Sequence, residues 1–221
     1  GTKTFDLLPD HWKTYEAEVT FGVQTDTEDI WGNVLKTHDV SKTPEEIIQA
    51  ICSFGGTYDQ IPPMYSAKKI DGKKLYQLAR EGKIVERKAV PVTLKDIQVL
   101  SVKDNKARFI VTCSAGTYIR TLCVDIGKKL GCEACMSSLT RVMAGGFSKE
   151  QALTLEKIKE LADKNELESR LISIDTALGH FPKVIASNEF EKQLKNGNAI
   201  GSNAVLGLQE ASIDVCSHDI C

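Results

Sequence analysis

Two side chains that could act on a substrate lie two positions apart in the run Gly116-Thr117-Tyr118-Ile119-Arg120-Thr121. Tyr118 offers an aromatic ring with a hydroxyl group. Arg120 offers a guanidinium that can hold a carboxylate in a fixed orientation through two parallel hydrogen bonds. Such an arginine calls for a carboxylate partner, and we expect the best candidate to lie upstream of residue 1. An ordinary structural salt bridge is the alternative role for Arg120.

The element that must position this pair is a helix predicted from about Thr117 to Leu130. Apolar residues recur there with the spacing of one buried stripe, at Ile119, Leu122, Cys123, Ile126 and Leu130. At about 100° per residue, Tyr118 and Arg120 flank that stripe on opposite sides, both in the first helical turn. They are therefore expected at the rim of the core, where the helix N-terminus adds partial positive charge.

The other predicted elements are strands and helices along the rest of the chain. Alternating apolar residues and β-rich composition predict strands over Tyr15–Val23, Val90–Val102 and Ala107–Cys113. A capping box formed by Thr43 and Glu46 begins a helix that should bury Ile47, Ile48, Ile51 and Phe54. Further helices are predicted over Lys73–Glu81, over Thr154–Lys164 and after a cap at Ser187.

The composition indicates one large folded domain, or one domain with a small appendage. Of the 221 residues 42% are hydrophobic, and the formal net charge is −2. No apolar run is long enough to cross a bilayer, and no signal peptide is evident at the start. Among the seven cysteines, Cys52, Cys113 and Cys123 lie in apolar segments, which indicates reduced core thiols of a cytoplasmic protein.

One segment has a charge opposite to that of the whole chain. Between Ser66 and Lys88 there are eight basic and three acidic residues. Such asymmetry can build a basic patch for an anionic partner, although a solvated helix face is the simpler interpretation.

Cys132 and Cys135 have the spacing of a redox or zinc motif. No second Cys-x-x-Cys motif and no histidine pair accompanies them, and the motif follows a helix instead of opening one. A redox or zinc protein therefore stays only as a third hypothesis.

Several short motifs occur in a fixed order over residues 1 to about 200. They are Thr2-Lys3-Thr4-Phe5-Asp6, Tyr15, Gly22 with Thr25-Asp26-Thr27-Glu28-Asp29 and Gly32, Gln60–Tyr76, Gly116–Arg120, and Leu139-Thr140-Arg141. Together they resemble the TruB family of tRNA pseudouridine synthases. The segment Ile61-Pro62-Pro63-Met64-Tyr65-Ser66-Ala67-Lys68 is the part that separates this family from other pseudouridine synthases.

The resemblance implies an α/β pseudouridine synthase fold, with a mixed, largely antiparallel sheet flanked by helices and incomplete at both ends. It also implies an enzyme that isomerises one uridine in the T-loop of tRNA, at position 55, by breaking the N-glycosidic bond and rejoining the ribose to carbon 5. Family members use an aspartate nucleophile and neither a metal nor an organic cofactor. The target nucleotide must be flipped out, at a cost of roughly a few kcal/mol. The implied partner is tRNA. We expect the protein to act as a monomer and not to bind a membrane.

The resemblance also implies roles for individual residues. By motif match Tyr15 stacks on the target base, Tyr118 is the active-site tyrosine and Arg120 pairs with the catalytic aspartate. Leu139 matches an apolar wall of the pocket, and Asp29 matches a polar contact near the flipped nucleotides. The remaining implied substrate contacts, to phosphates and bases, are Lys68, Lys69, Lys73, Tyr76, Arg80 and Arg141.

One family motif is missing from this sequence. The nucleophilic aspartate of the family belongs to a Gly-Thr-Leu-Asp-Pro-like motif expected before Thr2, whereas Asp6 and Asp10 come after that place. We therefore expect an N-terminally truncated fragment or an incomplete gene model that is inactive alone. Residues 1–178 would be the catalytic domain and residues 179–221 the start of a small C-terminal RNA-binding appendage. A catalytically dead tRNA-binding protein of the same fold is the alternative.

Overall fold

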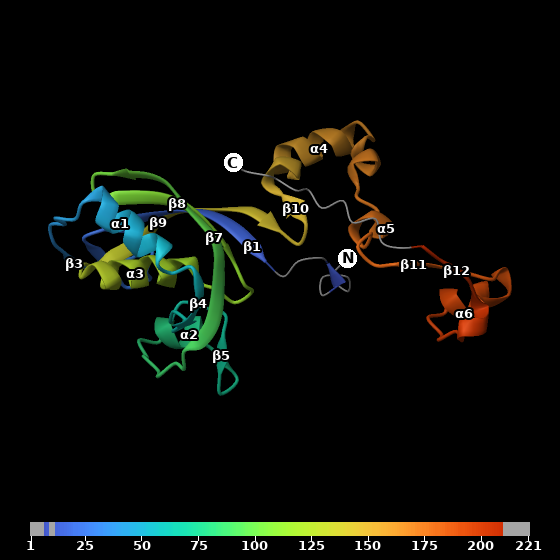
Figure 1. Cartoon of the computed structure of the whole chain (residues 1–221), viewed down its shortest axis with the longest axis horizontal. Helices are drawn as coiled ribbons and strands as arrows, with labels where there is room; N and C mark the ends of the chain where they lie inside the picture. Colours follow the sequence, from blue (N-terminus) through green and yellow to red (C-terminus); the bar gives the residue numbers. More distant parts are fainter. Residues whose placement is uncertain (1–6, 9–11, 210–221) are drawn as a thin grey trace. The chain divides into compact units, whose positions relative to one another are not determined.

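The computed structural model describes residues 7–8 and 12–209, which fall into two compact units (Figure 1). The first unit lies within Asp10–Ala152. The second comprises the described residues from Leu153 onward together with residues 7 and 8. The predicted domain boundary after residue 178 stays a prediction, because this division reflects compactness alone.

The first unit is built on an antiparallel sheet. Its strands are β1 (Lys13–Phe21), β4 (Gly56–Gln60), β7 (Val90–Lys103), β8 (Lys106–Cys113), β9 (Ala134–Ala144) and β10 (Phe147–Ser148). They lie in the order β10-β9-β1-β8-β7-β4, and each pairs antiparallel with its neighbours. The predicted α/β class with a largely antiparallel sheet is confirmed.

Two helices, α1 (Pro44–Cys52) and α3 (Ile119–Leu130), pack on one face of this sheet (Figure 1). Their apolar sides and the inward residues of the strands share one core, which includes Val19, Phe21, Ile51, Phe109 and Ile126. As expected, the apolar stripe of the helix predicted from Thr117 packs against the sheet.

The opposite face of β1 is charged. Glu16 pairs there with Arg108 of β8, and Glu18 pairs with Lys106 across 3.1 Å. Because successive residues of a strand point to opposite faces, the alternation along β1 produces one apolar and one charged face. The helices cover the apolar one.

Helix α1 begins at the predicted capping box. Thr43 N–H donates to Glu46 Oε2 over 2.8 Å, and Glu46 N–H donates back to Thr43 Oγ1 over 3.3 Å. Ile47 and Ile51 are buried, but Ile48 is 41% exposed, so its predicted burial is wrong. Ile48 lies about 100° round the helix from Ile47 and faces away from the sheet.

The strand predicted over Tyr15–Val23 is divided at Gly22. The short strand β2 (Val23–Thr25) leaves the sheet there and pairs with β3 (Val34–Thr37). Gly22 has φ +82°, and a Cβ atom at this position would collide with the carbonyl oxygen of His38. Only glycine fits this bend without strain.

The basic segment folds as a hairpin followed by a short helix. Strands β5 (Lys69–Ile70) and β6 (Lys73–Lys74) pair with each other, and α2 (Leu75–Arg80) follows. The predicted helix therefore begins two residues later than expected, because Lys73 and Lys74 are occupied in strand pairing. We call residues 68–80 the basic hairpin.

One prediction near the candidate site needs correction, and one strand was missed. Tyr118 is not in the first turn of α3 but is its N-cap, with extended backbone angles of φ −103° and ψ 109°. Strand β9 was not predicted at all, although it pairs with β1 along nearly its whole length.

The second unit consists of short elements. They are the helices α4 (Leu155–Asp163), α5 (Ile174–Ala177) and α6 (Glu191–Lys195), the antiparallel pair β11 (Lys183–Ala186) and β12 (Val205–Gln209), and single 3-10 turns such as η4 (Asn188–Phe190). Helix α4 forms within the predicted range Thr154–Lys164, and Thr154 caps it. Ser187 makes no side-chain cap bond, because the chain after it forms η4 first.

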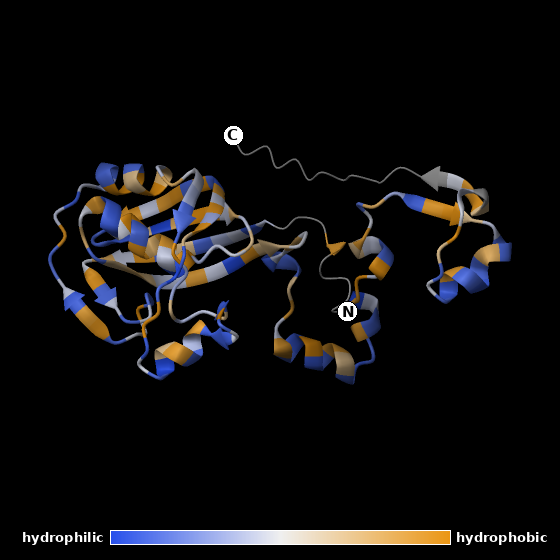
Figure 2. Ribbon diagram, turned by 90° about the horizontal axis from the view of Figure 1, so that it is seen from below, coloured by the Kyte–Doolittle hydropathy of each residue, from blue (hydrophilic) through white to orange (hydrophobic). Residues whose placement is uncertain are grey.

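Figure 2 shows apolar residues on β11, where Val184 is 52% exposed. Within residues 7–8 and 12–209, no helix is both long and apolar enough to span a bilayer.

Candidate active site

Arg120 joins three segments of the first unit. Its Nη1 donates to the carbonyl oxygen of Thr27 over 3.0 Å, and its Nη2 donates to the carbonyl oxygen of Tyr65 over 2.8 Å. Both acceptors are backbone groups and neither is a carboxylate. A guanidinium has five N–H donors, so the described part of the chain leaves Arg120 with capacity for a further, charged acceptor.

Glu28 is the carboxylate that lies near this guanidinium. The hydroxyl of Thr121 donates to Glu28 Oε2 over 2.7 Å, and Glu28 has a left-handed backbone with φ +64°. Burial raises the pKa of Glu28 above its usual range, although the Thr121 hydrogen bond and the charge of Arg120 act in the opposite direction. No sequence prediction named Glu28; its place inside the Thr25–Asp29 motif was the only signal.

Asp29 organises the loop that carries the Arg120 acceptor. Its Oδ1 accepts from Trp31 N–H over 3.0 Å, and its carbonyl oxygen accepts from the hydroxyl of Thr25 over 2.8 Å. Ile30 N–H donates to Met136 O of β9 over 2.8 Å, which fastens the loop to the sheet. In this structure Asp29 therefore holds the loop turn, and its predicted contact with a flipped nucleotide stays a prediction.

Tyr118 is fixed through its backbone and not through its side chain. Gln60, the last residue of β4, accepts from Tyr118 N–H over 2.8 Å and donates to Tyr118 O over 3.1 Å. The Gln60 side chain is buried, with 1% of its surface exposed. Gln60 lies in a family motif, but its contact with Tyr118 could not be predicted, because the two residues lie 58 positions apart.

Tyr15 and Arg141 are cross-strand neighbours on β1 and β9. Burial raises the pKa of Tyr15, and the adjacent Arg141 guanidinium partly offsets this effect. Leu139, two residues before Arg141, lies opposite Ala17 and is 41% exposed. The structure thus brings Tyr15, Leu139 and Arg141 together on neighbouring strands.

The start of α3 lies at the Tyr15 end of β1. Lys13 pairs with Cys113, the last residue of β8, so the chain enters the turn before α3 beside the beginning of β1. At the other end, Gly22 N–H donates to Glu133 O over 2.7 Å, just beyond the C-terminus of α3. The helix therefore runs alongside β1, and its N-cap Tyr118 and its first turn with Arg120 lie toward Tyr15.

The basic hairpin is anchored to the same region. Tyr76 N–H donates to the carbonyl oxygen of Ser66 over 3.0 Å, next to the Tyr65 carbonyl that Arg120 holds. Lys69 and Lys74 are directly opposite on β5 and β6, a like-charge pair that disfavours the hairpin unless an anion lies nearby.

Cations also gather at the ring of Tyr76. The Arg80 guanidinium lies 5.4 Å and the Lys74 ammonium 5.7 Å from its centroid. The other predicted RNA contacts are three lysines of the hairpin. Lys69 on β5 and Lys73 on β6 are exposed, and Lys68, just before β5, is half-buried.

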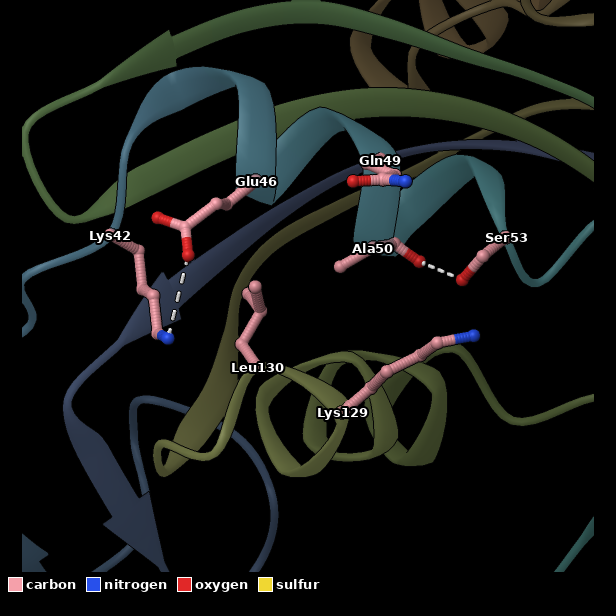
Figure 3. Close-up of a pocket in the computed structure, with 7 residues that line it drawn as sticks. All are labelled: Lys42, Glu46, Gln49, Ala50, Ser53, Lys129 and Leu130. Atoms are coloured by element: carbon pink, nitrogen blue, oxygen red, sulfur yellow. Dashed lines mark hydrogen bonds and ion pairs between the residues drawn. The ribbon is translucent and has the colours of Figure 1, made fainter.

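Two cavities adjoin the Arg120 region. One of about 350 Å³ is lined by Thr27, Glu28 and Tyr65 among others, and one of about 290 Å³ is lined by Glu28, Tyr58 and Thr121 among others. A third cavity, of about 380 Å³, lies between α1 and α3 (Figure 3). The Lys42–Glu46 ion pair and Lys129 line it, and Tyr118 and Arg120 do not.

The Cys132–Cys135 motif has the properties of packed thiols. Burial raises the pKa of both groups, which favours the unreactive thiol over the thiolate. Within the described ranges, no cluster of three His, Cys, Asp or Glu side chains could hold a metal ion. Cys113 and Cys123 are buried as predicted, whereas Cys52 is exposed and its predicted core position is wrong.

Comparison with known proteins gives matches over most of the chain. Residues 1–119 match the family described as TruB family pseudouridylate synthase (N terminal domain), and residues 120–179 match the tRNA pseudouridylate synthase B C-terminal domain. The chain is 46% identical over 206 residues to the tRNA pseudouridine synthase B of Alkaliphilus oremlandii, covering 93% of this chain and 68% of that protein. The chain belongs to the TruB family. The tRNA pseudouridine synthase B of Clostridium novyi is a further TruB relative. It is 44% identical, and the match covers 93% of this chain and 70% of that protein.

Solved structures share the TruB fold of this chain. A chain of a Cbf5-Nop10-Gar1 complex superposes with a TM-score of 0.66 at 24% identity, covering 94% of this chain and 55% of that chain. A chain of an H/ACA RNP bound to a substrate RNA containing 2'-deoxyuridine gives a TM-score of 0.61 at 22% identity, covering 90% of this chain and 51% of that one. This chain thus spans about half the length of the solved chains that it matches.

Proposed function

We propose that this TruB-family protein converts uridine to pseudouridine in the T-loop of tRNA, at position 55. The observation that carries the proposal is the placement of Arg120. Arg120 lies in the first turn of α3, and its guanidinium is held by two carbonyl oxygens and keeps further N–H groups for a carboxylate.

In this reaction the bond between C1' of the ribose and N1 of uracil breaks, and a bond between C1' and C5 forms. The proton on C5 is lost and N1 gains one, so the base is isomerised without any oxidant or reductant. An aspartate acts as the nucleophile. Arg120 would keep that carboxylate ionised, because an adjacent positive charge favours the charged form, and would orient it through parallel hydrogen bonds.

The remaining residues would hold the RNA. The uridine must leave its stack to reach the aspartate, and Tyr15 would replace the lost stacking, with Leu139 as an apolar wall. Tyr118 would lie beside the flipped base. The basic hairpin would contact backbone phosphates through Lys68, Lys69 and Lys73, while Tyr76 and Arg80 stack or pair with the RNA.

The nucleophile is proposed to come from outside these 221 residues. The sequence contains no Gly-Thr-Leu-Asp-Pro-like motif, and we propose that the chain is inactive without one. The test therefore uses a protein in which this chain is joined to the N-terminal segment of the Alkaliphilus oremlandii relative, and we expect this protein to be active. We call this the joined protein.

The test is release of tritium from C5. A T-loop stem-loop RNA labelled with 5-tritiated uridine only at position 55 is incubated with the joined protein. Stoichiometric release of tritium to water is the expected result. No release, with the RNA bound and the protein folded, would refute the proposal.

The alternative of a catalytically dead RNA-binding protein is not favoured, because both relatives described above are named as tRNA pseudouridine synthases. We further propose that the protein acts as a monomer in the cytoplasm, where tRNA is modified and where the free thiols of the described cysteines would stay reduced.

A further inference from the structure

Gln60 makes a two-point hydrogen-bonded contact with the backbone of Tyr118. Its Oε1 accepts from Tyr118 N–H over 2.8 Å, and its Nε2 donates to Tyr118 O over 3.1 Å. An amide side chain used in this way reproduces one rung of an antiparallel sheet. It holds Tyr118 in the extended conformation observed, with φ −103° and ψ 109°.

The orientation of the Gln60 amide is determined by its partners. A backbone N–H can only donate, so the side-chain oxygen must face Tyr118 N–H and the nitrogen must face the carbonyl. The same nitrogen also donates to the hydroxyl oxygen of Tyr58 over 2.6 Å. The buried amide therefore has a partner for each of its two ends, as a buried polar group requires.

The contact fixes a helix start that has no side-chain cap. An N-cap residue usually has a short polar side chain that accepts from the first helical turn, and Tyr118 has none. Its carbonyl oxygen already accepts the first intrahelical bond, from Leu122 N–H over 3.0 Å. Gln60 thus fixes the peptide groups at which α3 begins, two residues before Arg120.

We propose that Gln60 is a positioning residue for the reaction: it fixes the Tyr118 backbone, and through it the Tyr118 ring and the Arg120 guanidinium. The inference rests on the proposed function. No other common side chain at position 60 supplies both a donor and an acceptor at this reach, because leucine offers neither, ionised glutamate offers only acceptors, and asparagine is one methylene shorter.

The first experiment uses this chain and does not depend on activity. Amide hydrogen exchange is followed by NMR in the wild type, in Gln60→Leu and in Gln60→Glu, with Gln98→Leu, an exposed glutamine on β7, as the matched control. The Tyr118 amide is expected to lose about tenfold or more of its protection in Gln60→Leu, while Ile126 in the body of α3 is unchanged. Equal protection of Tyr118 in Gln60→Leu and the wild type would overturn the proposal.

Gln60→Glu adds a pH signature that a general packing role would not produce. A protonated carboxyl has one donor and one acceptor, like the amide, whereas the ionised form has no donor. In Gln60→Glu the Tyr118 N–H keeps an acceptor in both forms, whereas the Tyr118 carbonyl oxygen loses its donor when the carboxyl ionises. The 13C chemical shift of the Tyr118 carbonyl should therefore change with pH in Gln60→Glu and stay constant in the wild type. A pH-independent shift in Gln60→Glu would count against the proposal.

Kinetics of the joined protein complete the test. Gln60→Leu should lower kcat by about 10-fold or more with KM changed less than about threefold, because substrate contacts remain while the catalytic groups shift. Unchanged kcat would overturn the positioning role. If the wild-type joined protein forms no pseudouridine, the proposed function fails, yet the exchange experiment still decides whether Gln60 holds Tyr118.

Discussion

Arg120 Nη2 donates to the carbonyl oxygen of Tyr65 over 2.8 Å, so the first turn of α3 is bonded to the segment that leads into the basic hairpin. The second bond of Arg120, to Thr27, attaches the loop that contains Glu28 and Asp29. One side chain therefore sets the relative positions of the loop, the hairpin and the helix. A residue with this many neighbours is suited to hold a catalytic carboxylate in a fixed geometry.

Replacing Arg120 by lysine should distinguish the effect of its positive charge from the effect of its hydrogen-bond geometry. Lysine keeps the positive charge but cannot bond both carbonyls and also present two parallel donors to a carboxylate. In the joined protein we expect Arg120→Lys to lower kcat by about 100-fold, while the Kd for T-loop RNA changes less than about threefold. Single-turnover kinetics and filter binding measure the two quantities, with Lys106→Arg on the charged face of β1 and β8 as the control. A kcat within threefold of the wild type would contradict the role of Arg120.

Glu28 should make the stability of this chain depend on pH. Its pKa in the folded protein is raised above the ordinary value of 4.5, so the folded state holds the Glu28 proton more tightly than the unfolded state. The free energy of unfolding should therefore fall as the pH rises from about that ordinary value through the raised pKa, and then level off.

Glu28→Gln removes this titration and keeps an acceptor for Thr121. The stability of Glu28→Gln relative to the wild type should improve as the pH rises, as measured by denaturant unfolding between pH 4 and pH 8. Glu45→Gln, at an exposed position in α1, is the matched control. A stability difference that is constant across this range would show that Glu28 does not titrate as inferred.

The basic hairpin should determine how strongly RNA binding depends on salt. Each phosphate contact contributes about 0.7 to 0.9 to the slope of log K against log salt concentration. Lys69→Gln and Lys73→Gln should each reduce the slope for T-loop RNA by roughly this amount. Lys106→Gln, which removes a lysine paired with Glu18, should leave it unchanged. Equal slopes for all four proteins would exclude the hairpin as the phosphate contact.

Gly22 provides a test of the fold itself. Gly22→Ala introduces both a strained backbone at φ +82° and a collision with the His38 carbonyl, whereas Gly72→Ala has a similar φ of +79° in open space. Gly72→Ala should cost about 1 kcal/mol and Gly22→Ala clearly more, about 3 kcal/mol, in the free energy of unfolding. Chemical denaturation compares them, and equal costs would mean that the β1–β2 bend relaxes around an added methyl group.

Local signals in the sequence were sufficient for several elements. The Thr43–Glu46 capping box and the stripe from Ile119 to Leu130 specify α1 and α3 because hydrogen bonds and burial in a helix depend on neighbours three and four residues away. The alternation along β1 was equally informative up to Gly22.

What the sequence did not reveal depends on distant partners. Strand β9 carries Ser, Thr and Arg among its apolar residues, and its strand state comes from pairing with β1. The contacts of Gln60 with Tyr118 and of Arg120 with Tyr65 join residues more than 50 positions apart, which no local pattern encodes. The family motifs led to the predicted site residues, whereas only the structure shows the neighbours of these residues.

We propose that Tyr118 and Arg120 of this chain form half of an active site whose aspartate comes from a separate motif. The most direct measurement is pseudouridine formation at position 55 of a T-loop RNA by three proteins: this chain, the joined protein, and the joined protein with the motif aspartate changed to asparagine. We predict product with the joined protein alone. Turnover by the 221-residue chain, or equal turnover by the asparagine variant, would contradict the claim.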